Sequence, residues 1–330
     1  MKKMILRMLT VFLVVGSFGA GHGHAAENRD RPLVIAVLLY SKNNLQALAA
    51  FKAGLRERGY VEGQSVEYVF DGVVETMEEL DPAMARLMAR NPDLVYAAPT
   101  LAARAAQKAC REKRIPMLFG PANNAVETGL VKDRKHPGEN STGVMLSDSE
   151  AKRMQWAVEI APRIKNVLVP YNPEDKSALV SLHSAQEAAA SLGLAVIVKE
   201  VRNQAAIDAL LTQWPDGIDS VFLPRDGMVM SRVKDFAELA IRKKMVLSTG
   251  TRLDYVEKGA LLSYGFDDME LGKQVARLAD QIFKGKNPGD LPVETAEDYL
   301  AINLKTAQAI GVPVDAGVVR LARRVIRPEQ

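Results

Sequence analysis

Short apolar runs alternate with amphipathic segments along the chain from Arg31 onward. Runs such as PLVIAVLLY, SVEYVF, DLVYAAP and PMLFGP are rich in Val, Ile and Leu, and the segments between them carry apolar residues three and four positions apart. Continuous apolar runs are typical of parallel strands buried on both faces, and the intervening spacing is typical of helices that cover such a sheet. The pattern therefore predicts a doubly wound α/β lobe.

This order of elements occurs twice. The stretch NVLVPYNPEDKSALVSLHSAQEAAASLGLAVIVKEV, from Asn166, repeats the strand, polar loop, helix and strand of PLVIAVLLYSKNNLQALAAFKAGLRERGYVEGQSVEYVF, from Pro32. General similarity among α/β proteins could produce such a match, but here the loop positions correspond as well as the strands. We therefore expect two doubly wound, Rossmann-like lobes.

The stretch LLSYGFDDMELGKQVARLADQIFKGKNPGDLPVE, near the C-terminus, predicts how the lobes are joined. Asp267 and Asp268 can cap an amphipathic helix that ends at Gly285. A chain that returns to the first lobe with this helix, and leaves it again through LPVET, forms a multi-strand hinge. The expected lobes are an N-terminal one of residues 27–145 and 267–292, and a C-terminal one of residues 146–266 and 293–330.

Residues 1–26 have the layout of a secretory signal peptide. Lys2, Lys3 and Arg7 precede an apolar run, and small residues follow as far as Ala26. A membrane anchor needs about 20 continuous apolar residues, and glycine and serine interrupt this run earlier. We therefore expect cleavage of the signal and a periplasmic location for the mature protein.

The balance of charged residues argues against a nucleic-acid-binding function. The full chain has 43 Lys and Arg against 40 Asp and Glu, and three of the basic residues lie in the predicted signal peptide. The mature chain is then formally neutral. A large basic surface for nucleic acid is not expected.

The residue types needed for catalysis or metal binding are sparse. Cys110 is the only cysteine and lies in a predicted helix, and His136 and His183 are isolated. The chain lacks the HExxH, GxSxG, GxGxxG and Walker A motifs. We therefore expect no catalytic residues, no metal and no cofactor, although a hydrolase whose triad assembles from distant positions stays an alternative.

Polar loops follow the predicted strands, and ligands of open parallel sheets bind beyond the carboxyl ends of the strands. If the lobes face each other, their loops line one cleft, whose hydroxyls, amides, tyrosines and single Asp suit a small polar or zwitterionic molecule with an apolar part. These residue types are also ordinary in turns. The loops are Tyr40–Asn44, Ala98–Thr100, Gly120–Asn124, Tyr171–Ser177, Pro224–Asp226 and Ser248–Arg252.

Several longer stretches carry a family resemblance. The segments ERGYVEGQSVEY, NSTGV, PYNPEDKS, LPRD, ELGKQVARLADQIFKGKNPGDLPVE and INLKTAQAIG resemble those of substrate-binding proteins of bacterial ABC importers with the type I periplasmic fold. The resemblance is specifically to the family that includes binding proteins for tryptophan and related amino acids. It implies ligand contacts at Thr100, Ser177, Asp226 and Asn124, the last at a position where the family often has Asp.

The loops and the resemblance together give a predicted ligand set. Asp226 is in addition the predicted partner of a ligand ammonium, although it could equally cap the helix that follows it. The set is Tyr40, Thr100, Asn124, Tyr171, Ser177, Asp226, Thr249 and Phe266.

The resulting hypothesis is an extracytoplasmic binding protein. It would be a monomer that captures an amino acid or a similar polar or aromatic solute between its lobes and delivers it to an inner-membrane ABC permease. A sensory module that presents its liganded lobes to a membrane receptor is the first alternative. A periplasmic hydrolase that uses the same cleft is the second.

Overall fold

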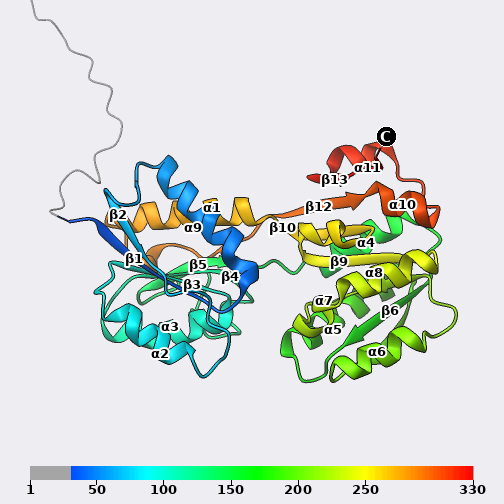
Figure 1. The fold of residues 1–330 in the computed structure, drawn as a ribbon, viewed down its shortest axis with the longest axis horizontal. Helices are drawn as coiled ribbons and strands as arrows, with labels where there is room; N and C mark the ends of the chain where they lie inside the picture. Colours follow the sequence, from blue (N-terminus) through cyan, green and yellow to red (C-terminus); the bar gives the residue numbers. More distant parts are fainter. Residues whose placement is uncertain (1–30, 330) are drawn as a thin grey trace, which may run out of the picture.

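The computed structural model describes residues 31–329 and shows two α/β lobes side by side (Figure 1). The predicted signal peptide lies outside the described residues. Each lobe has a largely parallel sheet with helices on both faces, which confirms the predicted two-lobe architecture. Within residues 31–329, no helix is both long enough and apolar enough to cross a membrane.

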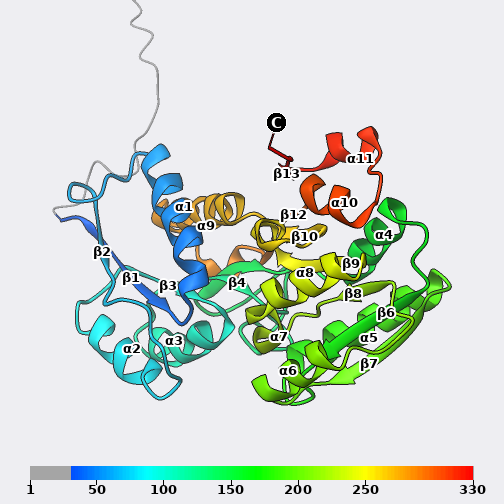
Figure 2. The ribbon, with the colours of Figure 1, turned by 45° about the vertical axis from the view of Figure 1, so that its right-hand side comes forward.

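The first lobe is built on a six-stranded, wholly parallel sheet. Its strands are β1 (Leu33–Leu39), β2 (Val66–Val69), β3 (Leu94–Ala98), β4 (Met117–Ala122), β5 (Ser141–Met145) and β11 (Glu294–Thr295), in the order β11-β5-β4-β3-β1-β2. Its helices are α1 (Leu45–Glu57), α2 (Leu80–Met88), α3 (Thr100–Glu112) and α9 (Asp268–Phe283), with short 3-10 turns η1 (Lys42–Asn44) and η3 (Pro288–Asp290). Helices α1 and α9 cover one face and α2 and α3 the other (Figures 1 and 2).

The second lobe is built on a seven-stranded sheet with one antiparallel pair. Its strands are β6 (Asn166–Tyr171), β7 (Ala195–Glu200), β8 (Ser220–Phe222), β9 (Val246–Arg252), β10 (Leu262–Phe266), β12 (Asp298–Asn303) and β13 (Arg324–Ile326), in the order β13-β12-β10-β9-β8-β6-β7. Its helices are α4 (Glu150–Ile160), α5 (Lys176–Ser191), α6 (Gln204–Thr212), α7 (Gly227–Ser231), α8 (Val233–Arg242), α10 (Leu304–Ile310) and α11 (Ala316–Leu321), with the 3-10 turn η2 (Leu253–Lys258). Helices α4, α5, α10 and α11 share one core, and α6, α7 and α8 share the other.

The chain passes between the lobes three times. The passages run from β5 to α4, from β10 to α9 and from β11 to β12. Strand β11 pairs with β5 in the first sheet, so the third passage lies between Thr295 and Asp298. The sequence predicts this boundary after Pro292. The short strand extends the first lobe by three residues.

Helix α9 returns to the first lobe through a tight contact with α1. Asp267 caps it by accepting hydrogen bonds from the N–H groups of Met269 and Glu270. A Cβ added at Gly272 would lie 2.4 Å from the Cβ of Ala50, so glycine lets the two helices approach closely. The apolar face of α9 is buried in the first core, as its spacing predicts.

One predicted loop is a strand instead. The segment Ser248–Arg252 forms the end of β9, and all five of its residues pair with β10. The hydroxyls of Thr249 and Ser263 are satisfied by backbone carbonyls of the neighbouring strand, Leu262 O at 3.3 Å and Arg252 O at 2.6 Å respectively. Because these polar side chains have partners inside the sheet, they do not mark a turn.

Candidate functional site

Three loops of the first lobe gather at the carboxyl ends of β1, β3 and β4. Thr100 begins α3 after β3, and its Oγ1 accepts a hydrogen bond from the N–H of Asn123 at 2.8 Å. This contact joins the loop after β3 to the loop after β4. In the latter loop, Asn124 Oδ1 accepts from the N–H groups of Val126 and Glu127 at 3.2 and 3.4 Å. The side chain of Asn124 thus fixes its own turn.

In the second lobe, the N-terminus of α5 occupies the corresponding place. Asp175 caps this helix through Oδ1, which accepts from the N–H groups of Ser177 and Ala178 at 2.8 and 3.3 Å. The side chains of Asp175 and Ser177 are both half-buried. A helix N-terminus carries free N–H groups and a partial positive charge, which favour an anion.

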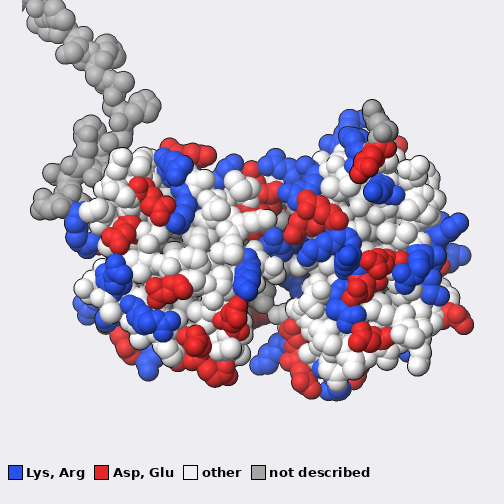
Figure 3. Space-filling view, in the orientation of Figure 1, with Lys and Arg blue, Asp and Glu red and all other residues white. Residues whose placement is uncertain are grey.

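The loops of the two lobes touch each other. Asn123 Nδ2 donates to Ser177 Oγ at 2.9 Å, and Arg252 Nη1 donates to the carbonyl oxygen of Asn43 at 2.7 Å. Both contacts join carboxyl-end segments of opposite sheets, so these ends face each other. Figure 3 shows the surface hollowed between the lobes at the lower edge of this view. This hollow and the loops beside it are the candidate ligand cleft.

Asp226 follows β8 and lies below the surface, with 1% of its area exposed. Its Oδ1 accepts from Met228 and Val229 N–H, both at 3.0 Å, and its Oδ2 accepts from Asn172 N–H at 2.6 Å. Burial raises the pKa of Asp226 above its ordinary value, although these N–H groups oppose the rise. The carboxylate therefore caps α7 and ties two loops of the second lobe together, as the alternative interpretation of this residue predicts.

Two other predicted ligand residues lie inside the cores. Thr249 is fully buried in β9, and Phe266 is 3% exposed and packs in the core of the first lobe beside Leu271. Both were expected at the cleft. The sequence does not show which way the side chain points for a polar residue late in a strand, such as Thr249, or for an aromatic residue before a hinge, such as Phe266. The structure separates these two from the cleft loops.

The two predicted tyrosines end equivalent strands but differ in environment. Tyr40, after β1, is half-buried. Tyr171, at the end of β6, is 8% exposed, and its hydroxyl donates to Glu200 at 3.2 Å. Tyr171 is therefore held against the outer strand β7, whereas Tyr40 is only half-buried and packs against the first lobe's second core.

A buried ionic cluster supports the loop after β8, and the sequence interpretation missed it. Arg225 forms a two-point ion pair with Glu150, at 2.8 and 3.0 Å, and also donates to the carbonyl of Ser147 at 3.1 Å. Burial by itself would raise the pKa of Glu150, but Arg225 and Arg153 hold it below its ordinary value. Ser147 also donates to Asp298. The cluster thus links the first and third passages between the lobes.

The second passage carries its own ion pair. Arg252 contacts Asp268 at 2.9 Å and Asp254 at 3.1 Å, and all three lie where β9 and β10 meet α9. Burial raises the pKa of Asp268 to about 6, against the lowering effect of Arg252. Because Arg252 also binds the carbonyl of Asn43, this pair connects the hinge to a cleft loop of the first lobe.

The cleft loops offer hydroxyl, amide, carboxylate and N–H groups. Cys110 is fully buried in α3, and burial raises the pKa of its thiol to about 12. Within residues 31–329, no group of three or more His, Cys, Asp or Glu side chains is placed to hold a metal ion. The arrangement is suited to binding a small polar molecule by hydrogen bonds.

Comparison with known proteins identifies the family. The family model described as ABC transporter substrate binding protein matches residues 33–326. A tyrosine-binding protein of Clostridioides difficile (strain R20291) is 26% identical over 266 residues, which cover 80% of this chain and 76% of the relative.

Two solved structures share the fold. An ABC domain from Streptococcus pneumonia in complex with L-Trp has a TM-score of 0.78 and 23% identity, over 90% of this chain and 100% of that chain. The ligand-free, open structure of a Clostridium difficile substrate binding protein with adhesive properties has a TM-score of 0.75 and 23% identity, over 90% and 99% of the two chains. Since the family model spans nearly all of the described residues, the chain belongs to the family of ABC transporter substrate-binding proteins.

Proposed function

We propose that this protein captures an L-amino acid with an aromatic side chain in the cleft between its lobes and delivers it to an ABC importer. The observation that carries the proposal is the meeting of two helix N-termini across the cleft. Thr100 begins α3, Ser177 is the second residue of α5, and Asn123 hydrogen-bonds to both residues, at 2.8 and 2.9 Å. Two N-termini with hydroxyl and amide donors suit a carboxylate.

The ammonium of the ligand would bind at Asp175. The Oδ1 atom of Asp175 holds the cap of α5, while its Oδ2 has no hydrogen bond within the described residues, and the side chain is half-buried beside Ser177. Asp226 has a backbone N–H on each of its oxygens and lies below the surface. We therefore transfer the predicted ammonium contact from Asp226 to Asp175.

Four further features support the choice of ligand and role. Tyr40 follows β1 at the cleft and is half-buried, and a tyrosine ring there suits contact with an aromatic side chain. The relatives include a tyrosine-binding protein and a domain in complex with L-Trp. The signal-like segment of residues 1–26 favours export to the periplasm, where an inner-membrane permease would receive the ligand from a monomer. Binding without catalysis fits cleft loops that contain neither His nor a thiol.

Thermal unfolding with a panel of amino acids, sugars and nucleosides tests the proposal. A ligand at about 100 times its Kd stabilises the folded state by about 2.7 kcal/mol, so a true ligand should raise the melting temperature clearly. L-Tyr and L-Trp are expected to do so. Tyramine lacks the carboxylate and N-acetyl-L-tyrosine lacks the ammonium, so both should fail. Stabilisation by sugars or nucleosides alone would contradict the proposed ligand class.

A further inference from the structure

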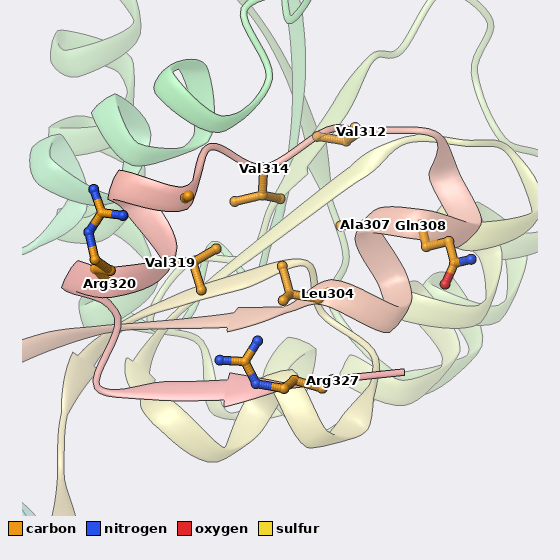
Figure 4. Close-up of a pocket in the computed structure, with 9 residues that line it drawn as sticks. Leu304, Ala307, Gln308, Val312, Val314, Val319, Arg320 and Arg327 are labelled. Carbon is orange, nitrogen blue, oxygen red and sulfur yellow. The ribbon is translucent and has the colours of Figure 1, made fainter. Parts of the chain in front are cut away.

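A second pocket lies in the C-terminal part of the second lobe, away from the cleft loops. It has a volume of about 500 Å³ and is lined by α10, α11, the turn between them and the residue after β13 (Figure 4). None of its lining residues belongs to the loops at the carboxyl ends of β1, β3, β4, β6 or β8. Small-molecule sites typically measure about 300 to 1,000 Å³. The pocket is therefore large enough for a ligand of its own.

The wall of this pocket is mainly apolar. Leu304 and Val314 are half-buried side chains that pack against the core of the lobe, and Val319 comes from α11 opposite them. In Figure 4 these three side chains surround the same space. An apolar concavity left open to solvent on an otherwise packed lobe favours a ligand with an apolar body.

Two arginines at the pocket have no counter-ion among residues 31–329. In the segment from residue 320 to residue 327, Arg323 pairs with Glu270 and Arg324 pairs with Glu257, both at 2.8 Å. Arg320 and Arg327 line the pocket and have no hydrogen bond or ion pair within the described residues. Figure 4 shows the Arg327 guanidinium beside Leu304 and Val319, with Arg320 at one edge.

Among the described residues, no Asp or Glu side chain lines the pocket. Asp315 lies nearby in the chain but caps α11, with its Oδ1 on the N–H of Gly317. Guanidinium groups bind carboxylates by paired, charge-assisted hydrogen bonds. The charge at the pocket thus favours an anion, while its wall favours an apolar body.

We infer that this pocket is a second ligand site, which binds an amphiphilic monocarboxylate of about the size of a medium-chain fatty acid. The apolar tail packs on Leu304, Val314 and Val319, and the carboxylate pairs with Arg327, with Arg320 at the rim. The site is independent of the amino acid cleft.

Calorimetric titration with decanoate, kept below its micelle concentration, tests the site, and decanol serves as the uncharged control with the same tail. The wild-type protein should bind one decanoate per chain and bind decanol at least tenfold more weakly. Arg327→Gln should weaken decanoate binding about tenfold, and Val319→Asp should abolish it. Arg324→Gln removes a paired arginine outside the pocket wall and should bind decanoate like the wild type. Melting temperatures verify that each variant folds.

Three results would overturn the inference. The first is the absence of saturable decanoate binding to the wild-type protein. The second is equal binding of decanol and decanoate together with no effect of Arg327→Gln, which would indicate unspecific apolar association. The third is loss of decanoate binding in Ser177→Trp, which fills the cleft, because the carboxylate would then have been bound between the lobes.

Discussion

Two aspartates at the second lobe show how one residue type takes different roles. Asp175 and Asp226 both cap helices. Asp175 is half-buried, and its Oδ2 has no hydrogen-bond partner among residues 31–329, whereas Asp226 is 1% exposed and both of its oxygens accept hydrogen bonds. A free carboxylate oxygen at a cleft can receive a ligand ammonium, while an engaged and buried one holds the scaffold. This difference separates the two residues experimentally.

Asp175→Asn should weaken binding of L-Tyr or L-Trp about 10- to 100-fold and leave the ligand-free protein nearly as stable as before. The amide keeps the helix cap, because Asn caps as well as Asp, but it loses the charge that pairs with the ammonium. Calorimetric titration and thermal unfolding measure the two effects. Equal affinities for the variant and the wild type would remove Asp175 from the site.

Asp226→Asn should instead destabilise the ligand-free protein and change the affinity for the ligand little. The amide NH2 would face either the N–H of Asn172 or the capped N–H groups of α7. One buried N–H then loses its acceptor, which costs about 1 to 3 kcal/mol of unfolding free energy. Urea denaturation of the ligand-free variant measures this loss. Unchanged stability with a large loss of affinity would restore Asp226 as the ammonium partner.

At the scale of elements, the hinge is built from ion pairs as well as from strands. The pair Arg252–Asp268 lies where β9 and β10 meet α9, and both side chains are 9% exposed. The pKa of Asp268 in the folded protein, about 6, lies above the ordinary value of 3.8. The folded state therefore holds this proton more tightly than the unfolded state does. Its contribution to the unfolding free energy rises as the pH falls from about 7 to about 4.

The matched variant for this effect is Asp268→Asn, which cannot titrate. The wild type should gain stability relative to Asp268→Asn as the pH is lowered from about 7 to about 4, by an amount on the order of 2 kcal/mol. Urea denaturation of both proteins at several pH values within this range gives the difference directly. A difference that stays constant would contradict this, because it would show that Asp268 titrates near its ordinary pKa in the folded protein. A difference that favours the variant at low pH would contradict it too, because it would show that folding lowers the pKa of Asp268.

Most helices and strands could be predicted from the sequence, because apolar runs and helical spacing follow directly from which side chains are buried. The cap of α9 at Asp267 and the helix that contains Cys110 followed from such local patterns. The buried positions of Thr249 and Phe266 could not be predicted from local patterns. The position of Thr249 depends on the partner strand β10, and that of Phe266 on the core of the other lobe. Asn123 was missed beside Asn124, since the chain order of two asparagines does not tell which one faces the opposite lobe.

At the scale of the whole molecule, three chain segments connect the two lobes, and a few contacts between loops also join them. Side-chain contacts across the cleft and hinge include Asn123–Ser177 and Arg323–Glu270, at 2.9 and 2.8 Å. Such contacts are weak singly and can exchange for contacts with a ligand that binds both lobes. The expected motion on binding is a rigid-body closure about the three passages.

Small-angle X-ray scattering of the free and the ligand-saturated protein tests this closure most directly. With L-Tyr or L-Trp at a concentration that calorimetry shows to be saturating, the radius of gyration should fall. With tyramine at the same concentration it should stay at the value of the free protein. An unchanged radius of gyration with a calorimetrically verified ligand would contradict capture of the amino acid by closure of the lobes.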